Sequence, residues 1–370
     1  MRLGVLLDHG MNISTLDREG QATRFVRSYL GAYAQVFDAV SFFSYSDEQP
    51  VLPAKVHTIP KPRRLRSILY ALLLPFIRAR EFRRCDVFRV MQMTGVLPAV
   101  IGKALFGTPF VATYGYRYRD FARLNAGKVR YFWIVLVERL GLQQASAIIV
   151  TTTELRDYVT RFTAPNRVHL VPNGVDVDHF SPAVTPKGFD PTSPVFAFVG
   201  RFGPQKNLPA LIEAIAEFGR GRLLMVGDGE MRPRLEEQAR RLGVAVEFLG
   251  TIDHDRLPAA LRAADIFVLP SLIEGHPKAL IEAMSLGLAC IGTDVNGIRD
   301  CIVDGETGVL CPTTDAVALK AAIERVVTDA ELRQRIAVNG RQYIVENLSI
   351  NRLIADEIMI LQRLARAKRR

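Results

Sequence analysis

Short apolar runs alternate with longer stretches of mixed polarity along most of the chain. Each apolar run has the length of a short strand that is buried on both faces of a sheet. The stretches between the runs place apolar residues three and four positions apart, as amphipathic helices do. Strands that alternate with helices predict an α/β fold with doubly wound parallel sheets. The expected strands begin at Leu3, Asp38, Asp86, Pro109 and Ala147 in the first half, and at Pro194, Leu223, Val246, Asp265 and Ala289 in the second, where the turn-rich stretch VDGETGVL ends the series.

The two series of strands are separated by a proline-rich stretch from Phe180 to Pro194, which is typical of an interdomain linker. We therefore expect a Rossmann-like domain at residues 1–183, a linker at 184–193 and a second Rossmann-like domain at 194–345. For residues 346–370 we expect a C-terminal helix and a basic tail. The helix is predicted because apolar residues recur at helical spacing from Ile350 to Leu364. Two facing domains of this kind would form an interdomain cleft lined by the carboxyl ends of both sheets, where ligands bind.

The composition agrees with a globular protein of two domains. The chain has 370 residues, of which 49% are apolar and 23% charged, and a single core rarely serves so long a chain. The four cysteines show no CxxC spacing, so we expect neither a disulfide framework nor a zinc site. The first apolar run is short and turns acidic, and the other runs are too short to span a membrane. These features favour a cytoplasmic protein.

The net charge of +10 is concentrated in two segments. Eight basic residues stand against the single acid Glu81 from Lys61 to Arg84, and five more lie from Arg363 to Arg370. Such local charge favours an anionic partner, and we expect peripheral contact with a membrane surface. A core-facing helix with solvated ends is the alternative for the first segment. Nucleic acid is not expected, because no binding module is present. The apolar residues of the first segment that share a helical face are Leu65, Ile68, Leu69, Leu72 and Phe76.

A loop with two cations follows the first strand of the second series. The strand ends at Gly200, Arg201 and Lys206 flank a Gly-Pro turn, and Asn207 can cap the next helix. Two cations beside the free N–H groups of a helix N-terminus suit a phosphate or diphosphate. A solvated surface loop is the alternative.

Two glutamates flank the start of another helix in the stretch PSLIEGHPKALIEAM. Glu274 precedes the helix, which we expect to begin near Lys278, and Glu282 lies one turn inside it. If the first N–H groups, on Lys278 and Ala279, face a diphosphate, both carboxylates should bind neutral hydroxyls. Glu282 would then hold a ribose diol and Glu274 a transferred sugar. The alternative is that these acids simply cap the helix.

Taken together, VGRFGPQKN, VGDGEMRPRLEEQARRLG, ADIFVLPSLIEGHPKALIEAM and GTDVNGIRDCIVDGETGVL resemble the retaining glycosyltransferases of family four, which have the GT-B fold. The resemblance covers the second domain, and PNGVDVDHF extends it back across the linker. It implies that Arg201 and Lys206 bind the donor diphosphate, that the amides near Lys278 and Ala279 cradle phosphate, that Glu282 binds the ribose and that Glu274 binds the donor sugar. With Gly200, Gly227 and Gly275 these residues make up the expected donor site, and Arg201, Lys206 and Glu274 are the expected catalytic residues.

The first domain matches this family less closely. Family members usually carry a Gly-Gly pair in the first loop, and here only Gly20 of that pair is present. Where the family often has a histidine near the transferred sugar, this chain has Tyr114, which can bond a hydroxyl but cannot take up charge near neutral pH. Both residues are included in the expected donor site. We leave open whether Tyr114 replaces the histidine.

Two further patterns in the chain do not change this interpretation. Asp176 and Asp178 spell a DxD motif that holds a metal in another glycosyltransferase fold, but they follow an Asn-Gly turn and are expected to cap it. No metal is expected, because Arg201 and Lys206 can neutralise the leaving diphosphate. Gly227 and Gly229 lack the third glycine of a dinucleotide fingerprint, which disfavours NAD.

The function we predict is transfer of a sugar, with retention, from a UDP- or GDP-sugar to an acceptor hydroxyl. A glycan or lipid-linked acceptor in polysaccharide biosynthesis is the acceptor we expect. The rivals are a nucleotide-sugar epimerase of the same fold and a non-catalytic scaffold at the membrane. A glycoside hydrolase that uses Glu274 and Glu282 as its carboxylate pair fits the neighbouring cations less well.

Overall fold

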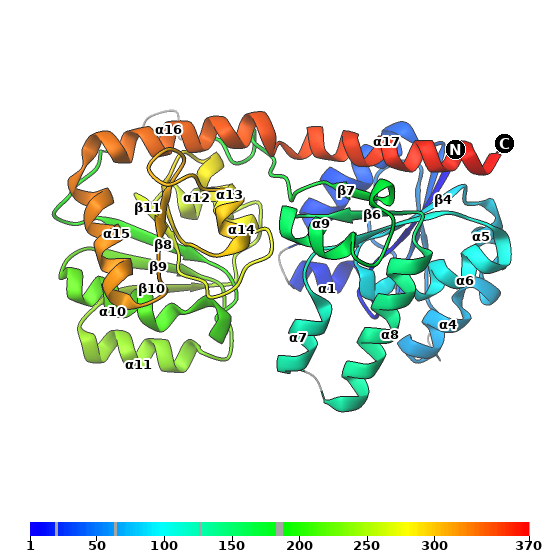
Figure 1. Ribbon diagram of the computed structural model, residues 1–370, viewed down its shortest axis with the longest axis horizontal. Helices are drawn as coiled ribbons and strands as arrows, with labels where there is room; N and C mark the ends of the chain where they lie inside the picture. Colours follow the sequence, from blue (N-terminus) through cyan, green and yellow to red (C-terminus); the bar gives the residue numbers. More distant parts are fainter. Residues whose placement is uncertain (19–20, 63–64, 126, 183–187, 370) are drawn as a thin grey trace. The chain divides into compact units, whose positions relative to one another are not determined.

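The computed structural model describes residues 1–18, 21–62, 65–125, 127–182 and 188–369 (Figure 1). It contains two compact units, one made of Met1–Pro172 with Asn351–Arg370 and the other of Asn173–Ile350. The sequence placed the first boundary at 183, whereas the contacts place it after Pro172, so residues 173–182 go with the second unit. Gly20 and residues 183–187, which include part of the expected linker, lie outside the described residues.

The first unit is built on a seven-stranded parallel sheet with the order β3-β2-β1-β4-β5-β6-β7. Leu3 pairs with Val40 on one side and with Val87 on the other, so the strand order reverses direction between β1 and β4. All five strands expected in this half are present, and two short edge strands, β3 and β7, join them. The strands are β1 (Arg2–Leu6), β2 (Ala39–Phe43), β3 (Val56–Ile59), β4 (Val87–Val90), β5 (Phe110–Tyr114), β6 (Ala147–Val150) and β7 (Val168–Leu170).

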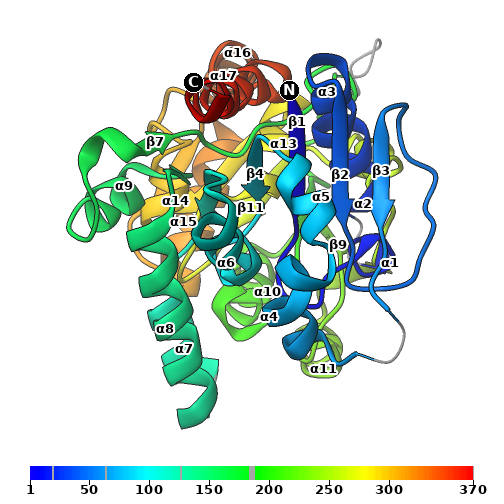
Figure 2. The ribbon, with the colours of Figure 1, turned by 90° about the vertical axis from the view of Figure 1, so that its right-hand side faces the viewer.

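Helices cover both faces of this sheet, as the alternating pattern predicts. Three of them, α4, α6 and α8, pack in sequence with α6 in the middle (Figure 2). The helices of the unit are α1 (Ile13–Arg18), α2 (Ala22–Arg24), the π-helix η1 (Phe25–Leu30), α3 (Gly31–Val36), α4 (Ser67–Ile77), α5 (Ala79–Arg84), η2 (Met93–Gly95), α6 (Leu97–Phe106), α7 (Tyr118–Asn125), α8 (Lys128–Gln144), α9 (Thr153–Val159) and η3 (Pro165–Arg167).

The second unit has a six-stranded parallel sheet with the order β10-β9-β8-β11-β12-β13. The order reverses between β8 and β11, and ligands of doubly wound folds bind at the carboxyl ends of the strands at such a point. The strands are β8 (Val195–Val199), β9 (Arg222–Val226), β10 (Ala245–Gly250), β11 (Ile266–Leu269), β12 (Ala289–Thr293) and β13 (Val309–Cys311).

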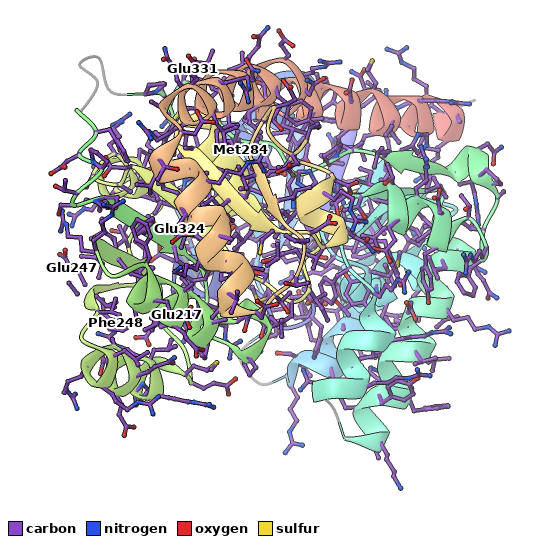
Figure 3. All side chains as sticks on the ribbon, turned by 60° about the vertical axis from the view of Figure 1, so that its left-hand side comes forward. Glu217, Glu247, Phe248, Met284, Glu324 and Glu331 are labelled. Atoms are coloured by element: carbon purple, nitrogen blue, oxygen red, sulfur yellow. The ribbon has the colours of Figure 1, made fainter. Side chains whose placement is uncertain are left out.

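The helices of the second unit pack closely on this sheet and on each other. Met284 lies beneath α16 (Figure 3), and a Cβ at Gly340 on that helix would lie 3.5 Å from the Met284 Cε. The helices are η4 (Pro204–Lys206), α10 (Leu208–Phe218), α11 (Arg232–Leu242), α12 (Leu257–Leu261), α13 (Lys278–Ser285), α14 (Asn296–Arg299), α15 (Ala316–Thr328) and α16 (Ala330–Asn347).

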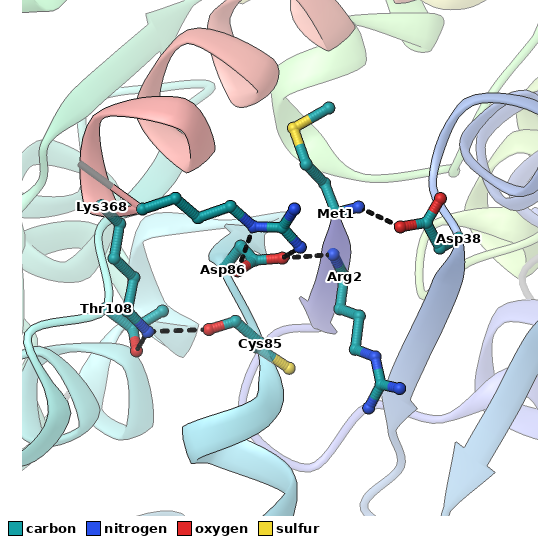
Figure 4. Close-up of polar contacts among 8 residues, drawn as sticks. Met1, Arg2, Asp38, Cys85, Asp86, Thr108 and Lys368 are labelled. Carbon is teal, nitrogen blue, oxygen red and sulfur yellow. Dashed lines mark hydrogen bonds and ion pairs between the residues drawn. The ribbon is translucent and has the colours of Figure 1, made fainter.

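The last helix, α17 (Ile350–Arg369), packs against the first unit through buried and surface polar contacts. Glu357 is 3% exposed and receives two bonds of 2.8 Å from the guanidinium of Arg89 on β4. At the end of the helix, Lys368 donates to the Cys85 carbonyl at 2.9 Å (Figure 4), and Arg369 pairs with Asp86. The C-terminal segment is therefore an integral part of the N-terminal unit. Among the described residues, no helix is both long enough and apolar enough to cross a bilayer.

Candidate functional site

Two loops of the second unit meet where its strand order reverses. The first runs from Gly200 to Asn207 after β8, and the second runs from Pro270 to Pro277 after β11. A backbone bond of 2.8 Å from the Leu272 N–H to the Gln205 carbonyl joins them. The loops that the sequence singled out for phosphate and sugar binding therefore lie side by side.

Lys206 and Glu274 form the polar centre of these loops. The Lys206 Nζ donates to the Glu274 Oε1 at 2.5 Å, and the Ser271 hydroxyl donates to the same oxygen at 2.7 Å. Their side chains are 18% and 10% exposed, so the pair is largely shielded from water. A cation and a carboxylate held this close can each recognise a different part of one ligand, the cation a phosphate and the carboxylate a sugar hydroxyl.

The glycines of the expected site allow the strand-end loops to approach closely. A Cβ on Gly227, at the end of β9, would lie 2.0 Å from the carbonyl oxygen of Gly200, at the end of β8. Gly227 also has a φ of +125°, which disfavours any other residue. These glycines bring the loops after β8 and β9 together. Arg201 directly follows Gly200, and its side chain is exposed.

Helix α13 begins at Lys278, where the sequence placed it, and Pro277 before it offers no capping side chain. The N–H groups of Lys278 and Ala279 lie in its first turn, where backbone donors have no partner within the helix. Glu282 lies one turn further along and is 5% exposed, with its Oε1 at 3.1 Å from the His254 Nε2. Because Glu274 bonds Lys206 and Ser271, the geometry gives no support to helix capping by Glu274.

Two residues that the sequence analysis missed hold this region in place. Gly297 in α14 lies so close to the second loop that its Cβ would be 1.3 Å from the carbonyl oxygen of Gly275. His254, in the loop after β10, contacts Glu282 and packs against the rings of His179 and Phe180, at centroid distances of 5.9 and 5.1 Å. Neither is signalled by spacing, since both act through contacts between segments distant in sequence.

The DxD pattern behaves as a turn. The Asp176 Oδ1 accepts the backbone N–H groups of Asp178 at 3.3 Å and His179 at 3.1 Å. Nearby, His179, His254 and Asp255 have ligand atoms within 4.8 Å of one another. In this group the Nε2 of His254 lies 3.1 Å from the Oε1 of Glu282.

In the first unit, Tyr114 lies at the carboxyl end of β5 but inside the core. Its side chain is fully buried, and its hydroxyl donates to Glu138, which also accepts a bond of 2.7 Å from Arg119. Burial and the neighbouring Glu138 carboxylate hold the pKa of Tyr114 well above its usual range. Its contact with a transferred sugar remains a prediction, and in this conformation the hydroxyl is occupied.

Two doubly wound parallel units, arranged as in solved structures of GT-B glycosyltransferases, give the chain the GT-B fold. Residues 22–179 match the model of Glycosyltransferase Family 4, and residues 183–343 match that of Glycosyl transferases group 1. The chain belongs to this family of group 1, family 4 glycosyltransferases, which confirms the family and fold class predicted from the sequence.

Relatives of known activity agree with this assignment. The chain is 31% identical over 278 residues, 70% of each chain, to the UDP-Gal:alpha-D-GlcNAc-diphosphoundecaprenol alpha-1,3-galactosyltransferase of Escherichia coli. It is 34% identical over 169 residues, 44% of each chain, to the phosphatidyl-myo-inositol mannosyltransferase of Mycolicibacterium smegmatis. Among solved structures, the sucrose-phosphate synthase of Thermosynechococcus elongatus has a TM-score of 0.81 at 22% identity, covering 99% of this chain and 100% of that one. The Anabaena HepE protein in complex with UDP-glucose has a TM-score of 0.75 at 18% identity, covering 98% and 100%.

Proposed function

We propose that this glycosyltransferase moves a sugar, with retention of configuration, from a UDP- or GDP-sugar to an acceptor hydroxyl. The observation that carries the proposal is the shielded Lys206–Glu274 pair beside the start of α13, where the strand order of the second unit reverses. The acceptor we propose is a lipid-linked glycan. The Escherichia coli relative, whose named acceptor is a diphosphoundecaprenol-linked sugar, supports it.

Different groups of these loops would bind the diphosphate, the sugar and the ribose of the donor. Lys206, Arg201 and the N–H groups of Lys278 and Ala279 would neutralise the diphosphate, whose negative charge grows as the sugar leaves. Glu274 would accept hydrogen bonds from the sugar, and Glu282 from the ribose diol. Since Lys206 donates to Glu274 in the structure, donor binding would redirect the Lys206 ammonium to phosphate and leave the Glu274 carboxylate for the sugar.

No metal is required by this scheme, because fixed cations and amides stabilise the departing diphosphate directly. The expected consequence is that EDTA leaves turnover unchanged.

Contact with an anionic membrane surface through the segment from Lys61 to Arg84 also belongs to the proposal. On α4 the side chains of Ile68 and Phe76 are 55% and 56% exposed, whereas Tyr70 and Leu74 are buried. Of the apolar face identified in the sequence, Ile68, Leu69 and Phe76 are exposed, whereas Leu72 is half-buried and Leu65 packs against the core. The exposed part of this face supports the membrane contact that we propose. The tail contributes less than its charge suggests, because Lys368 and Arg369 bond to the first unit.

The experiment that tests the donor proposal is nucleotide release from a panel of UDP- and GDP-sugars, with EDTA present and total membrane lipid as acceptor. Release from one donor that depends on the lipid is the expected result, and it identifies the base and sugar together. Interconversion of donors without lipid would instead indicate an epimerase. Release from no donor, while the Escherichia coli relative turns over in a parallel reaction, would favour the non-catalytic scaffold.

A further inference from the structure

The two halves of helix α8 have different environments. Its C-terminal half packs into the core of the first unit, where Val137, Gly141 and Leu142 are buried. The packing at Gly141 is so close that a Cβ would lie 2.2 Å from the Met93 sulfur. The N-terminal half carries exposed apolar residues, and packing in the core does not explain why these residues are apolar.

Four apolar side chains of this half are exposed to solvent. The exposed fractions are 87% for Val129, 68% for Phe132, 39% for Trp133 and 37% for Leu136. Their spacing, with steps of three, one and three residues, places them along one side of the helix. Single exposed apolar residues are ordinary on protein surfaces, but a contiguous aromatic and aliphatic stripe marks an interaction site.

The charged residues of the sequence that carries this stripe are basic. Residues 121–137 contain no aspartate or glutamate, whereas Arg123, Lys128 and Arg130 are all exposed. Tyr131 adds a third aromatic ring, and its hydroxyl accepts a bond of 3.3 Å from the Arg123 Nε. Tryptophan and tyrosine favour the level of the lipid headgroups, and basic residues beside them pair with anionic lipids.

We propose that the N-terminal half of α8 inserts into the headgroup region of an anionic bilayer, with Val129, Phe132, Trp133 and Leu136 towards the acyl chains and Lys128 and Arg130 among the phosphates. The complementary charge and the exposed aromatic residues together identify lipid as the partner. This surface is separate from the segment from Lys61 to Arg84. The inference goes beyond the proposed transferase activity, because lipid binding needs neither donor nor acceptor.

The test uses Trp133, which is the only tryptophan in the chain. Its fluorescence is recorded in the full-length protein as vesicles of phosphatidylglycerol and phosphatidylcholine in equal parts are added. We expect a shift of the emission to shorter wavelength and quenching by lipids brominated on the acyl chain. Vesicles of pure phosphatidylcholine should bind at least tenfold more weakly, because they lack the charge that attracts Lys128 and Arg130.

A double variant, Val129→Ser with Phe132→Ser, keeps the reporter and should weaken vesicle binding at least tenfold. The matched control is Val317→Ser on α15, where the exposed fraction is also 68%; it should bind as the unsubstituted protein does. Both changes are at exposed positions, so equal melting temperatures are expected. Absence of a Trp133 shift with anionic vesicles, or unchanged binding by the double variant, would overturn the inference. So would a dimer in solution that the double variant abolishes, since a second copy would then be the occupant of this surface.

Discussion

At the scale of single residues, the proposed donor site is arranged through contacts that join distant parts of the chain. Lys206 and Glu274 meet at 2.5 Å because each follows a strand next to the reversal of strand order. Replacing Lys206 with alanine should lower turnover about 100-fold, equivalent to about 2.7 kcal/mol in the barrier, because one charge on the leaving diphosphate loses its partner. Steady-state kinetics with the preferred donor checks this.

The control for that variant is Lys320→Ala, which removes another lysine of the same unit from its ion pair with Glu324 at 2.9 Å. It should turn over normally. If the turnover of Lys206→Ala is within about a factor of three of this control, Lys206 does not stabilise the leaving diphosphate.

His254 is a positioning residue for Glu282 in our account. Its side chain is 11% exposed and its Nε2 lies 3.1 Å from the carboxylate. Replacement by phenylalanine keeps the ring packing but loses the hydrogen bond, so we expect the KM for the donor to rise about tenfold with little change in kcat. Glutamine, which restores an N–H donor, should recover part of the loss. A change in kcat alone, or no rescue by glutamine, would contradict this role.

Gly297 shapes the same loop from the other side. An added Cβ would overlap the Gly275 carbonyl, so Gly297→Ala must displace the backbone next to Glu274. We expect a loss of about 1–3 kcal/mol in the free energy of unfolding, together with reduced donor affinity. The control is Gly188→Ala, because nothing lies within 4 Å of a Cβ added at that position. It should change neither the stability nor the donor affinity. Unfolding in urea and donor binding by calorimetry measure both, and a Gly297→Ala variant that matches the control would contradict the role.

At the scale of elements, the C-terminal helix is held to the first unit by a buried charge network. Arg89 and Glu357 are 2% and 3% exposed, and Arg89 also donates to Thr113 at 2.7 Å. Glu357→Ala leaves the guanidinium of Arg89 buried without its carboxylate, which should cost about 3–5 kcal/mol of stability. Urea unfolding of the intact chain measures the loss.

Arg369→Gln is the matched control for this helix, because it breaks the ion pair with Asp86 at the surface, where the Arg369 side chain is 53% exposed. Its melting temperature should stay close to that of the unsubstituted protein. If Glu357→Ala is no less stable than this control, the buried Arg89–Glu357 pair does not hold α17 to the first unit.

The elements themselves were largely readable from the sequence, because strands of a parallel sheet are continuous apolar runs. The edge strands Val56–Ile59 and Val168–Leu170 were missed, since each is short and contains a histidine. The helical spacing after Ile350 predicted α17. The packing of this helix on the first unit was not predicted, because it depends on the contact between Glu357 and Arg89, which are 268 residues apart. In the same way, the position of Tyr114 at a strand end did not reveal that it points into the core.

At the scale of the whole molecule, some of the basic residues bond to the protein itself and others are exposed to solvent. Lys368 and Arg369 in the tail bond to the first unit, whereas the segment from Lys61 to Arg84 and α8 carry the basic residues that we propose for contact with an anionic partner. Both segments belong to the first unit, whereas the proposed donor site lies in the second. This division suits an enzyme that takes a water-soluble donor on one unit and a lipid-linked acceptor on the other.

The most direct test of this account counts both products of the reaction. With the donor identified from the panel and membrane lipid as acceptor, nucleoside diphosphate and glycolipid are quantified over time, with EDTA present. We predict one nucleotide released per glycolipid formed, and the same anomeric configuration in product and donor. Nucleotide release without glycolipid, conversion of the donor without release, or inversion at the anomeric carbon would contradict the proposal that this chain is a retaining, metal-independent transferase.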